Sequence, residues 1–168
     1  METGSLKVEV RAAADGTNSI EGYAAVFDSL SEDLGGFREM LCRGAFKRAL
    51  ARGTDILCLM DHDKKQLLGR TSSGTCQVME DENGLRFRCS MPATRLGADL
   101  MEQIRRGDIS ECSFGFCMSG NDDDEDWSEE MDGEGRSFFK RTIRSVDRLT
   151  DVSPVLAGAY KATSVKVV

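Results

Sequence analysis

His62 is the only histidine among the 168 residues, so any mechanism that uses an imidazole as a base depends on this one side chain. It follows the apolar run 56–60 and therefore lies just past the end of a predicted strand. The ordinary pKa of an imidazole suits it to proton transfer near neutral pH. A lone histidine in such a place is nevertheless more often a surface or hydrogen-bonded residue than a catalyst.

Ser113 is the best candidate for a nucleophile that such a base could activate. A serine hydroxyl keeps its proton at neutral pH, so it needs a base within about 3 Å and a third group that holds the base. Ser113 lies in the strand-like segment Cys112-Ser113-Phe114-Gly115-Phe116. Because side chains alternate between the faces of a strand, Cys112, Phe114 and Phe116 should face the core. Ser113 and Gly115 then share the opposite face.

Other interpretations of this segment stay open. Cys112 is a rival nucleophile for the same histidine, although a thiol that points into the core with two phenylalanines would be inert. Ser113 could equally be an ordinary small residue beneath a neighbouring strand. The G-x-S-x-G turn of α/β-hydrolases is absent from the sequence.

Three carboxylates are candidates for the group that orients His62. Asp61 and Asp63 are its neighbours in the sequence, whereas Asp151 belongs to a separate strand-like segment. Asp151 could approach the imidazole from behind, or it could simply cap a turn.

The cysteines do not indicate a metal or cofactor site. There are six, without a C-x-x-C pair, and a single histidine cannot complete a conventional zinc spacing with them. We expect reduced, mostly buried thiols, and no cofactor.

Negative charge is concentrated in one segment. Residues 122–134 contain nine of the 29 acidic residues and no lysine or arginine, so the rest of the chain is nearly neutral. A calcium-binding EF-hand loop does not fit, because Trp127 stands where glycine is required and Gly133 where the final glutamate belongs. We expect a solvated, mobile acidic loop insertion at about 120–137 that would repel nucleic acid.

Length and composition predict a single domain, residues 1–168, in a soluble protein made in the cytoplasm. No apolar stretch is long enough to cross a bilayer, and the first residues lack the order of a secretory signal. No membrane partner is expected.

The patterning favours strands over helices. Strands are expected at 6–10 and 19–27 as an opening hairpin, at 55–60 in a central position, at 75–79 and 85–91 as a second hairpin, and within 137–155. Helices are expected at 44–51 and after the capping residue Thr94, with an apolar stripe of Leu96, Leu100 and Ile104 that ends before Gly107. The expected fold is mostly β with helices (α+β), an antiparallel β barrel or sandwich with helical additions.

Several phrases, taken in order, resemble the prohead (capsid maturation) protease family of tailed bacteriophages. Each is weak alone, but the ordered set is specific and covers roughly Ile20 to Thr163. The phrases are Glu21-Gly22-Tyr23-Ala24-Ala25-Val26-Phe27, Gly44-Ala45-Phe46, His62-Asp63 with Leu68-Gly69-Arg70, Gly84-Leu85, Gly107-Asp108-Ile109 leading to Ser113-Phe114-Gly115-Phe116, and Asp151-Val152-Ser153-Pro154-Val155.

The resemblance implies a serine endopeptidase with a fold similar to herpesvirus assemblins, an antiparallel β barrel surrounded by helices. In that interpretation His62 matches the family's catalytic histidine and Ser113 its nucleophile. Family members carry glutamate at the place of Asp151, so the shorter side chain here is a departure at the third position.

The resemblance also implies the partners and the place of action. Its substrates would be the scaffold protein, the scaffolding segment of the major capsid protein, and the protease itself, cleaved inside the assembling procapsid in the host cytoplasm. Self-association is expected on the same ground. A rival hypothesis from another class is a non-catalytic capsid-assembly or scaffold-binding module on the same fold.

Overall fold

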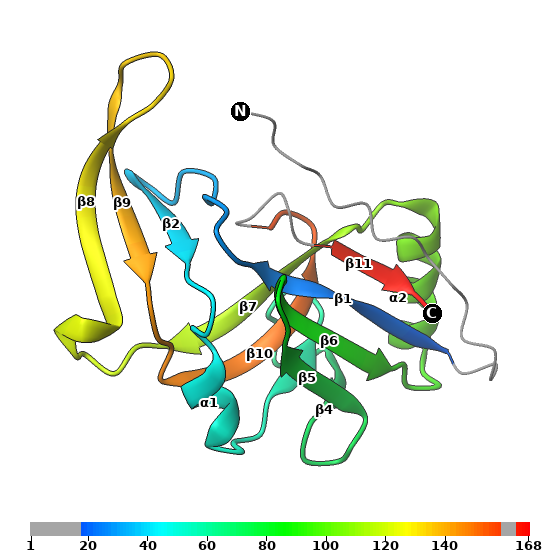
Figure 1. The fold of residues 1–168 in the computed structure, drawn as a ribbon. Coiled ribbons are helices and arrows are strands. Elements are labelled where there is room, and N and C mark those ends of the chain that lie inside the picture. Colours follow the sequence, from blue (N-terminus) through cyan, green and yellow to red (C-terminus); the bar gives the residue numbers. More distant parts are fainter. Residues whose placement is uncertain (1–17, 159–163) are drawn as a thin grey trace.

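In the computed structural model, the described residues are 18–158 and 164–168 (Figure 1). Strands dominate, so the prediction of a mostly β, α+β chain is confirmed. The α-helices among these residues are α1 (Lys47–Ala51) and α2 (Arg95–Arg106), and neither is long and apolar enough to span a bilayer.

The strands form three sheets. The first has the order β11 (Ser164–Val167), β1 (Ser19–Val26), β6 (Gly84–Ser90) and β5 (Cys76–Glu80). The second has the order β4 (Leu67–Arg70), β3 (Leu57–Leu59), β10 (Arg148–Val155) and β7 (Glu111–Cys117). The third has the order β2 (Phe37–Leu41), β9 (Ser137–Ile143) and β8 (Glu125–Met131).

No closed barrel is found among these described strands, because each of the three sheets is open. The expected barrel, similar to that of herpesvirus assemblins, therefore stays a prediction. Of the predicted opening hairpin, residues 6–10 lie outside the described residues; among the described strands, β1 pairs with β6 and β11.

Two of the elements predicted most clearly from the sequence are confirmed. The β5–β6 hairpin forms in register from Cys76 opposite Cys89 to Glu80 opposite Leu85. Thr94 caps α2 by accepting a hydrogen bond from the Gly97 amide, and the helix ends at Gly107 in the left-handed conformation.

One buried cluster of apolar side chains joins the sheets. Phe46, beside α1, is fully buried and packs against Phe27 at 6.0 Å and, edge to face, against Phe114 of β7 at 5.3 Å between ring centroids. This packing fixes the inner face of β7. Its outer face is therefore the one that carries Ser113.

The prediction of an acidic loop at about 120–137 is wrong, because much of this segment has regular secondary structure. Residues 122–124 form a short 3₁₀ helix, and β8 follows and pairs with β9 over its whole length. Figure 1 shows β8 and β9 as a long hairpin on the side of the molecule opposite α2.

Basic side chains from other elements explain why this acidic segment forms regular secondary structure. Asp124 accepts two hydrogen bonds from Arg48 of α1, and Arg141 and Lys140 of β9 pair with Glu125 and Glu130. Residues 122–134 of the acidic segment contain no basic residue, and α1 and β9 supply the positive charges that pair with them. The segment is therefore an ion-paired hairpin.

Candidate active site

The turn after β3 presents His62. Asp61 and His62 both adopt positive φ, 51° and 58°, which is uncommon for residues other than glycine and is often found at functional sites. The Asp61 amide donates to the carbonyl of Pro154 in β10 at 2.9 Å, so the turn is fixed to the neighbouring strand. Asp63 closes the turn by accepting bonds from the Lys65 amide and the Gln66 side chain.

His62 contacts Asp151 rather than either of its sequence neighbours. Its Nδ1 lies 2.6 Å from Asp151 Oδ2, although the residues are far apart in the sequence. β10 pairs in parallel with β3, with Asp151 opposite Leu57, and this pairing brings the aspartate beneath the turn. Asp63 is engaged in the turn itself, so Asp151 is the carboxylate that the structure brings to the imidazole.

The pKa shifts of His62 and Asp151 indicate which atom donates and which accepts in the hydrogen bond between them. The Asp151 contact raises the pKa of His62, against the opposite effect of burial. Burial acts to raise the pKa of Asp151, but hydrogen bonds from His62, Ser153 and Thr150 outweigh it and lower the pKa. An ionised carboxylate can only accept, so in the neutral imidazole Nδ1 carries the proton and Nε2 keeps a lone pair.

Asp151 faces this side of the sheet because of an irregularity in β10. Leu149 lies opposite Phe116, whereas Asp151 lies opposite Gly115, so Thr150 is an extra residue in β10. Strict alternation would place Asp151 on the same face as the buried Leu149. The bulge instead turns Asp151 to the outer face.

Ser113 lies on that same face. It is directly opposite Ser153 in the antiparallel β7–β10 pair, one pleat from the Gly115–Asp151 pair. Its side chain is half-buried, and among residues 18–158 and 164–168 no hydrogen bond joins it to His62. Catalytic hydrogen bonds are often long without substrate, so this arrangement is compatible with proton transfer after binding.

The geometry offers a base held by an ionised carboxylate and a serine on the adjacent strand. Residues 5–168 of the chain match the caudovirus prohead serine protease family. The chain belongs to this family. Membership makes it one of a family of hydrolases, serine proteases of bacteriophages that act in capsid maturation. No curated protein matches the chain.

In this member of the prohead protease family, the place of Cys112 on the inner face of β7 argues against it as the nucleophile. Cys112 is fully buried, and burial together with the nearby Glu111 raises the pKa of its thiol well above the ordinary value. A buried, protonated thiol is a poor nucleophile. The alternation predicted from the sequence is thus confirmed for Cys112 and Phe114.

The structure brings together three cysteines that their spacing in the sequence does not connect: Cys58, Cys76 and Cys89. Their Sγ atoms all lie within 4.8 Å of one another in the core. Thiol hydrogen bonds from Cys58 and Cys76 lower the pKa of Cys89. The cluster offers three soft ligands, one fewer than a structural zinc site uses.

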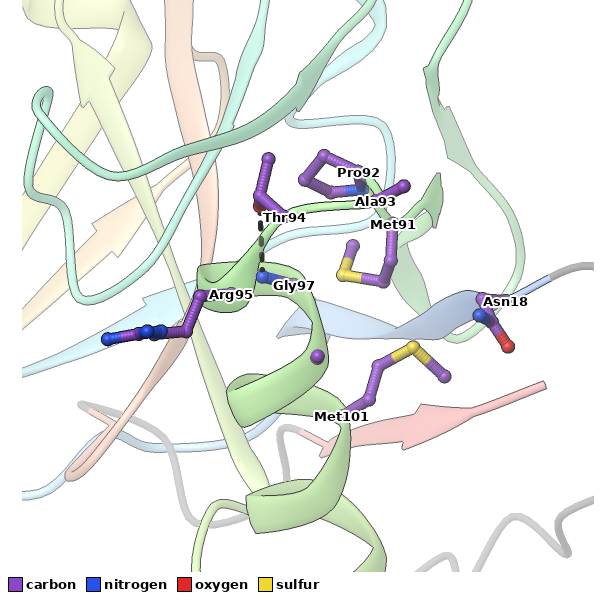
Figure 2. Close-up of a pocket in the computed structure, with 9 residues that line it drawn as sticks. Asn18, Met91, Pro92, Ala93, Thr94, Arg95, Gly97 and Met101 are labelled. Carbon is purple, nitrogen blue, oxygen red and sulfur yellow. Dashed lines mark hydrogen bonds between the residues drawn. The ribbon is translucent and has the colours of Figure 1, made fainter.

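A cavity of about 340 Å³ lies away from these residues, around the first turn of α2. Figure 2 shows its lining, which includes Met91, Met101 and the capped Thr94–Gly97 turn. His62, Ser113 and Asp151 are not among the residues that line it. The cavity is thus separate from the candidate active site.

Sequence reasoning missed two residues that contact the site. Ser153 and Thr150 both donate hydrogen bonds to Asp151, at 2.8 and 3.0 Å. Closeness to Asp151 in the sequence was the only signal that could have pointed to them. The bulge that turns Thr150 toward Asp151 leaves no distinctive residue pattern.

Proposed function

We propose that this chain is a serine endopeptidase that cleaves capsid precursor proteins during prohead maturation, with Ser113 as its nucleophile. The observation that carries the proposal is the 2.6 Å contact between His62 and Asp151, on the same sheet face as Ser113, in a member of the prohead protease family. The substrates would be the scaffold protein or the scaffolding segment of the major capsid protein, and the chain itself. Cleavage would take place inside the procapsid in the host cytoplasm.

The proposed mechanism follows from the two nitrogens of His62. Asp151 holds Nδ1, so Nε2 accepts the Ser113 proton as Oγ attacks the scissile carbonyl. The imidazolium that forms is stabilised by the adjacent carboxylate and then donates its proton to the departing amine. Water, activated by the same nitrogen, releases the acyl group from Ser113 and regenerates the enzyme.

The Glu-to-Asp difference at residue 151 motivates the alternative of a non-catalytic assembly module. A shorter acid would reach less far from an unchanged strand. Here the turn that carries His62 is itself fixed to β10 through Pro154, and the aspartate makes a short hydrogen bond. The difference therefore gives little support to the loss of catalysis.

Cleavage of the cognate capsid precursor tests the proposal. Purified protein incubated with the scaffold or precursor capsid protein should give discrete fragments, resolved by electrophoresis and mass spectrometry. Ser113→Ala should abolish them, because removing the nucleophile of a triad costs about 10⁶-fold in kcat.

Ser110→Ala is the matched control, because Ser110 is exposed and lies three residues away, just before β7. It should cleave as the wild type does. Fragments that persist undiminished in Ser113→Ala would refute the assignment of the nucleophile.

A further inference from the structure

The Asp151 carboxylate occupies space that only a glycine at residue 115 leaves open. A Cβ atom added to Gly115 would lie 2.2 Å from Asp151 Oδ1 and 2.4 Å from Thr150 Oγ1. Both distances are far below van der Waals contact, so any other residue there must displace the carboxylate or the hydroxyl. Glycine is therefore required at residue 115 because there is no space for a Cβ atom, and not because of its backbone conformation.

Both oxygens of the carboxylate have a hydroxyl donor. Thr150 Oγ1 donates to Oδ1 at 3.0 Å, and Ser153 Oγ donates to Oδ2 at 2.8 Å. Oδ2 is also the oxygen that contacts His62. Ser153 is fully buried and Asp151 nearly so, which means that few water molecules can replace these donors.

The bulge in β10 makes this arrangement possible. In a regular strand Thr150 and Asp151 would point to opposite faces. The extra residue lets both side chains lie over Gly115, and Ser153 returns to the same face two residues later. Bulges commonly redirect a side chain beside an active site.

We propose that Thr150, Ser153 and the vacant position at Gly115 form a cradle that positions the Asp151 carboxylate against His62. This inference rests on the proposed function, because the cradle acts through the base of that reaction. Thr150 and Ser153 are positioning residues that touch neither the substrate nor the reacting atoms. The cradle accounts for how aspartate works where the family resemblance leads one to expect glutamate.

The first test places a methyl group in the cradle. Gly115→Ala should displace the carboxylate and lower kcat about 10²-fold, the loss that a misplacement of about 1 Å can cause. The pKa of His62 should also fall toward 6.5, because the contact that raises it is lost. His62 is the sole histidine, so its imidazole NMR signals can be titrated without assignment.

The matched control is Gly133→Ala, because Gly133 has ordinary φ and open space where its Cβ would lie. This variant should keep the wild-type kcat and the wild-type His62 titration. An unchanged pKa of His62 in folded Gly115→Ala would overturn the cradle, whatever the activity. The pKa of His62 also tests the cradle separately from the proposed function. It depends on the position of Asp151 whether or not Ser113 is the nucleophile.

The second test keeps the shape of the cradle and removes one donor. Thr150→Val is nearly isosteric and should lower kcat about tenfold with little change in KM, as expected for the loss of a hydrogen bond to a charged group. Thr150→Ser keeps the hydroxyl and should restore kcat. Equal kcat values in the Val and Ser variants would overturn the role of Thr150, and this comparison decides the matter if Gly115→Ala does not fold.

Discussion

At the residue scale, the two nitrogens of His62 have different environments. Nδ1 is held by Asp151, and 39% of the imidazole side chain is exposed, so Nε2 remains available to a substrate-bound serine. His62 and Ser113 could be chosen from the sequence because one is unique and the other follows from strand alternation. From the residues alone Asp151 could be named only as one of three carboxylates, since the bulge beside it in β10 decides its direction and has no distinctive residue pattern.

The pH dependence of cleavage follows from the raised pKa of His62. The neutral imidazole is the base, so kcat/KM should fall as the pH drops through a value above 6.5. Asp151→Asn should move this acid limb to lower pH and lower kcat by up to about 10⁴-fold. The pH profile of peptide cleavage measures both effects, and an acid limb at the same pH in both proteins would contradict the pairing.

The same pair should make stability depend on pH. The raised pKa of His62 contributes stability that is present below 6.5 and is lost as the pH rises through the folded-state pKa. The lowered pKa of Asp151 contributes stability that is present above 3.8 and is lost as the pH falls through its folded-state pKa. The contribution should therefore be largest between about pH 4 and 6.5.

Chemical denaturation of wild type and His62→Gln measures this effect. The difference in unfolding free energy between them should be larger at about pH 5.5 than at about pH 9. A difference that is the same at both pH values would show that the ion pair is not formed in solution.

At the element scale, the β8–β9 hairpin pairs with β2 through the backbone of β9, and Arg141 adds ion pairs to this attachment. This side chain pairs with Glu39 of β2 and Glu125 of β8, and it lies over the Trp127 ring at 5.8 Å. Glu39 is buried, so removing a cationic partner from its carboxylate is costly. Arg141 therefore adds side-chain contacts to the backbone pairing of β9 with β2.

Arg141→Ala should lower the free energy of unfolding by about 3 kcal/mol, measured by urea denaturation. Arg136→Ala in the same hairpin is the matched control and should cost less than about 1 kcal/mol, because its ion pairs with Asp132 and Glu134 are exposed. Similar losses in both variants would contradict this account of the hairpin.

The hairpin also shows where sequence patterning fails. Nine acids without a local base indicate a solvated loop when the segment is considered alone. The bases that order it come from α1 and β9, and this pairing is a tertiary property. Helix α2 could be predicted because its cap, apolar stripe and terminal glycine are all local. Short strands such as β2, β4 and β11 lack such local signals.

At the scale of the whole molecule, one apolar cluster draws side chains from all three sheets, including Ile20, Leu41, Cys58, Ile143 and Val152. The single domain expected from length and composition stays a prediction, and a shared core is the arrangement that such a domain would have. Trp127, the only tryptophan, reports on the hairpin, while far-UV circular dichroism reports on the whole backbone. The two thermal unfolding curves should coincide, and an earlier transition in fluorescence would show that the hairpin unfolds separately.

Four of the six cysteines are buried: Cys58, Cys76, Cys89 and Cys112. In the native protein a thiol reagent should react rapidly only with Cys42 and Cys117, whereas denaturation should expose the rest. Iodoacetamide should therefore leave cleavage intact, and Cys112→Ala should remain active. Inactivation that follows alkylation of Cys112 would instead favour a cysteine hydrolase.

Covalent labelling with a serine-directed fluorophosphonate tests the central claim most directly. The reagent requires a serine activated by its base, so intact-mass and peptide analysis should find one adduct on Ser113 in the wild type. His62→Ala should lose the adduct, while Ser110→Ala should retain it. An adduct on another residue, or equal labelling of Ser113 without His62, would contradict the proposed catalytic site.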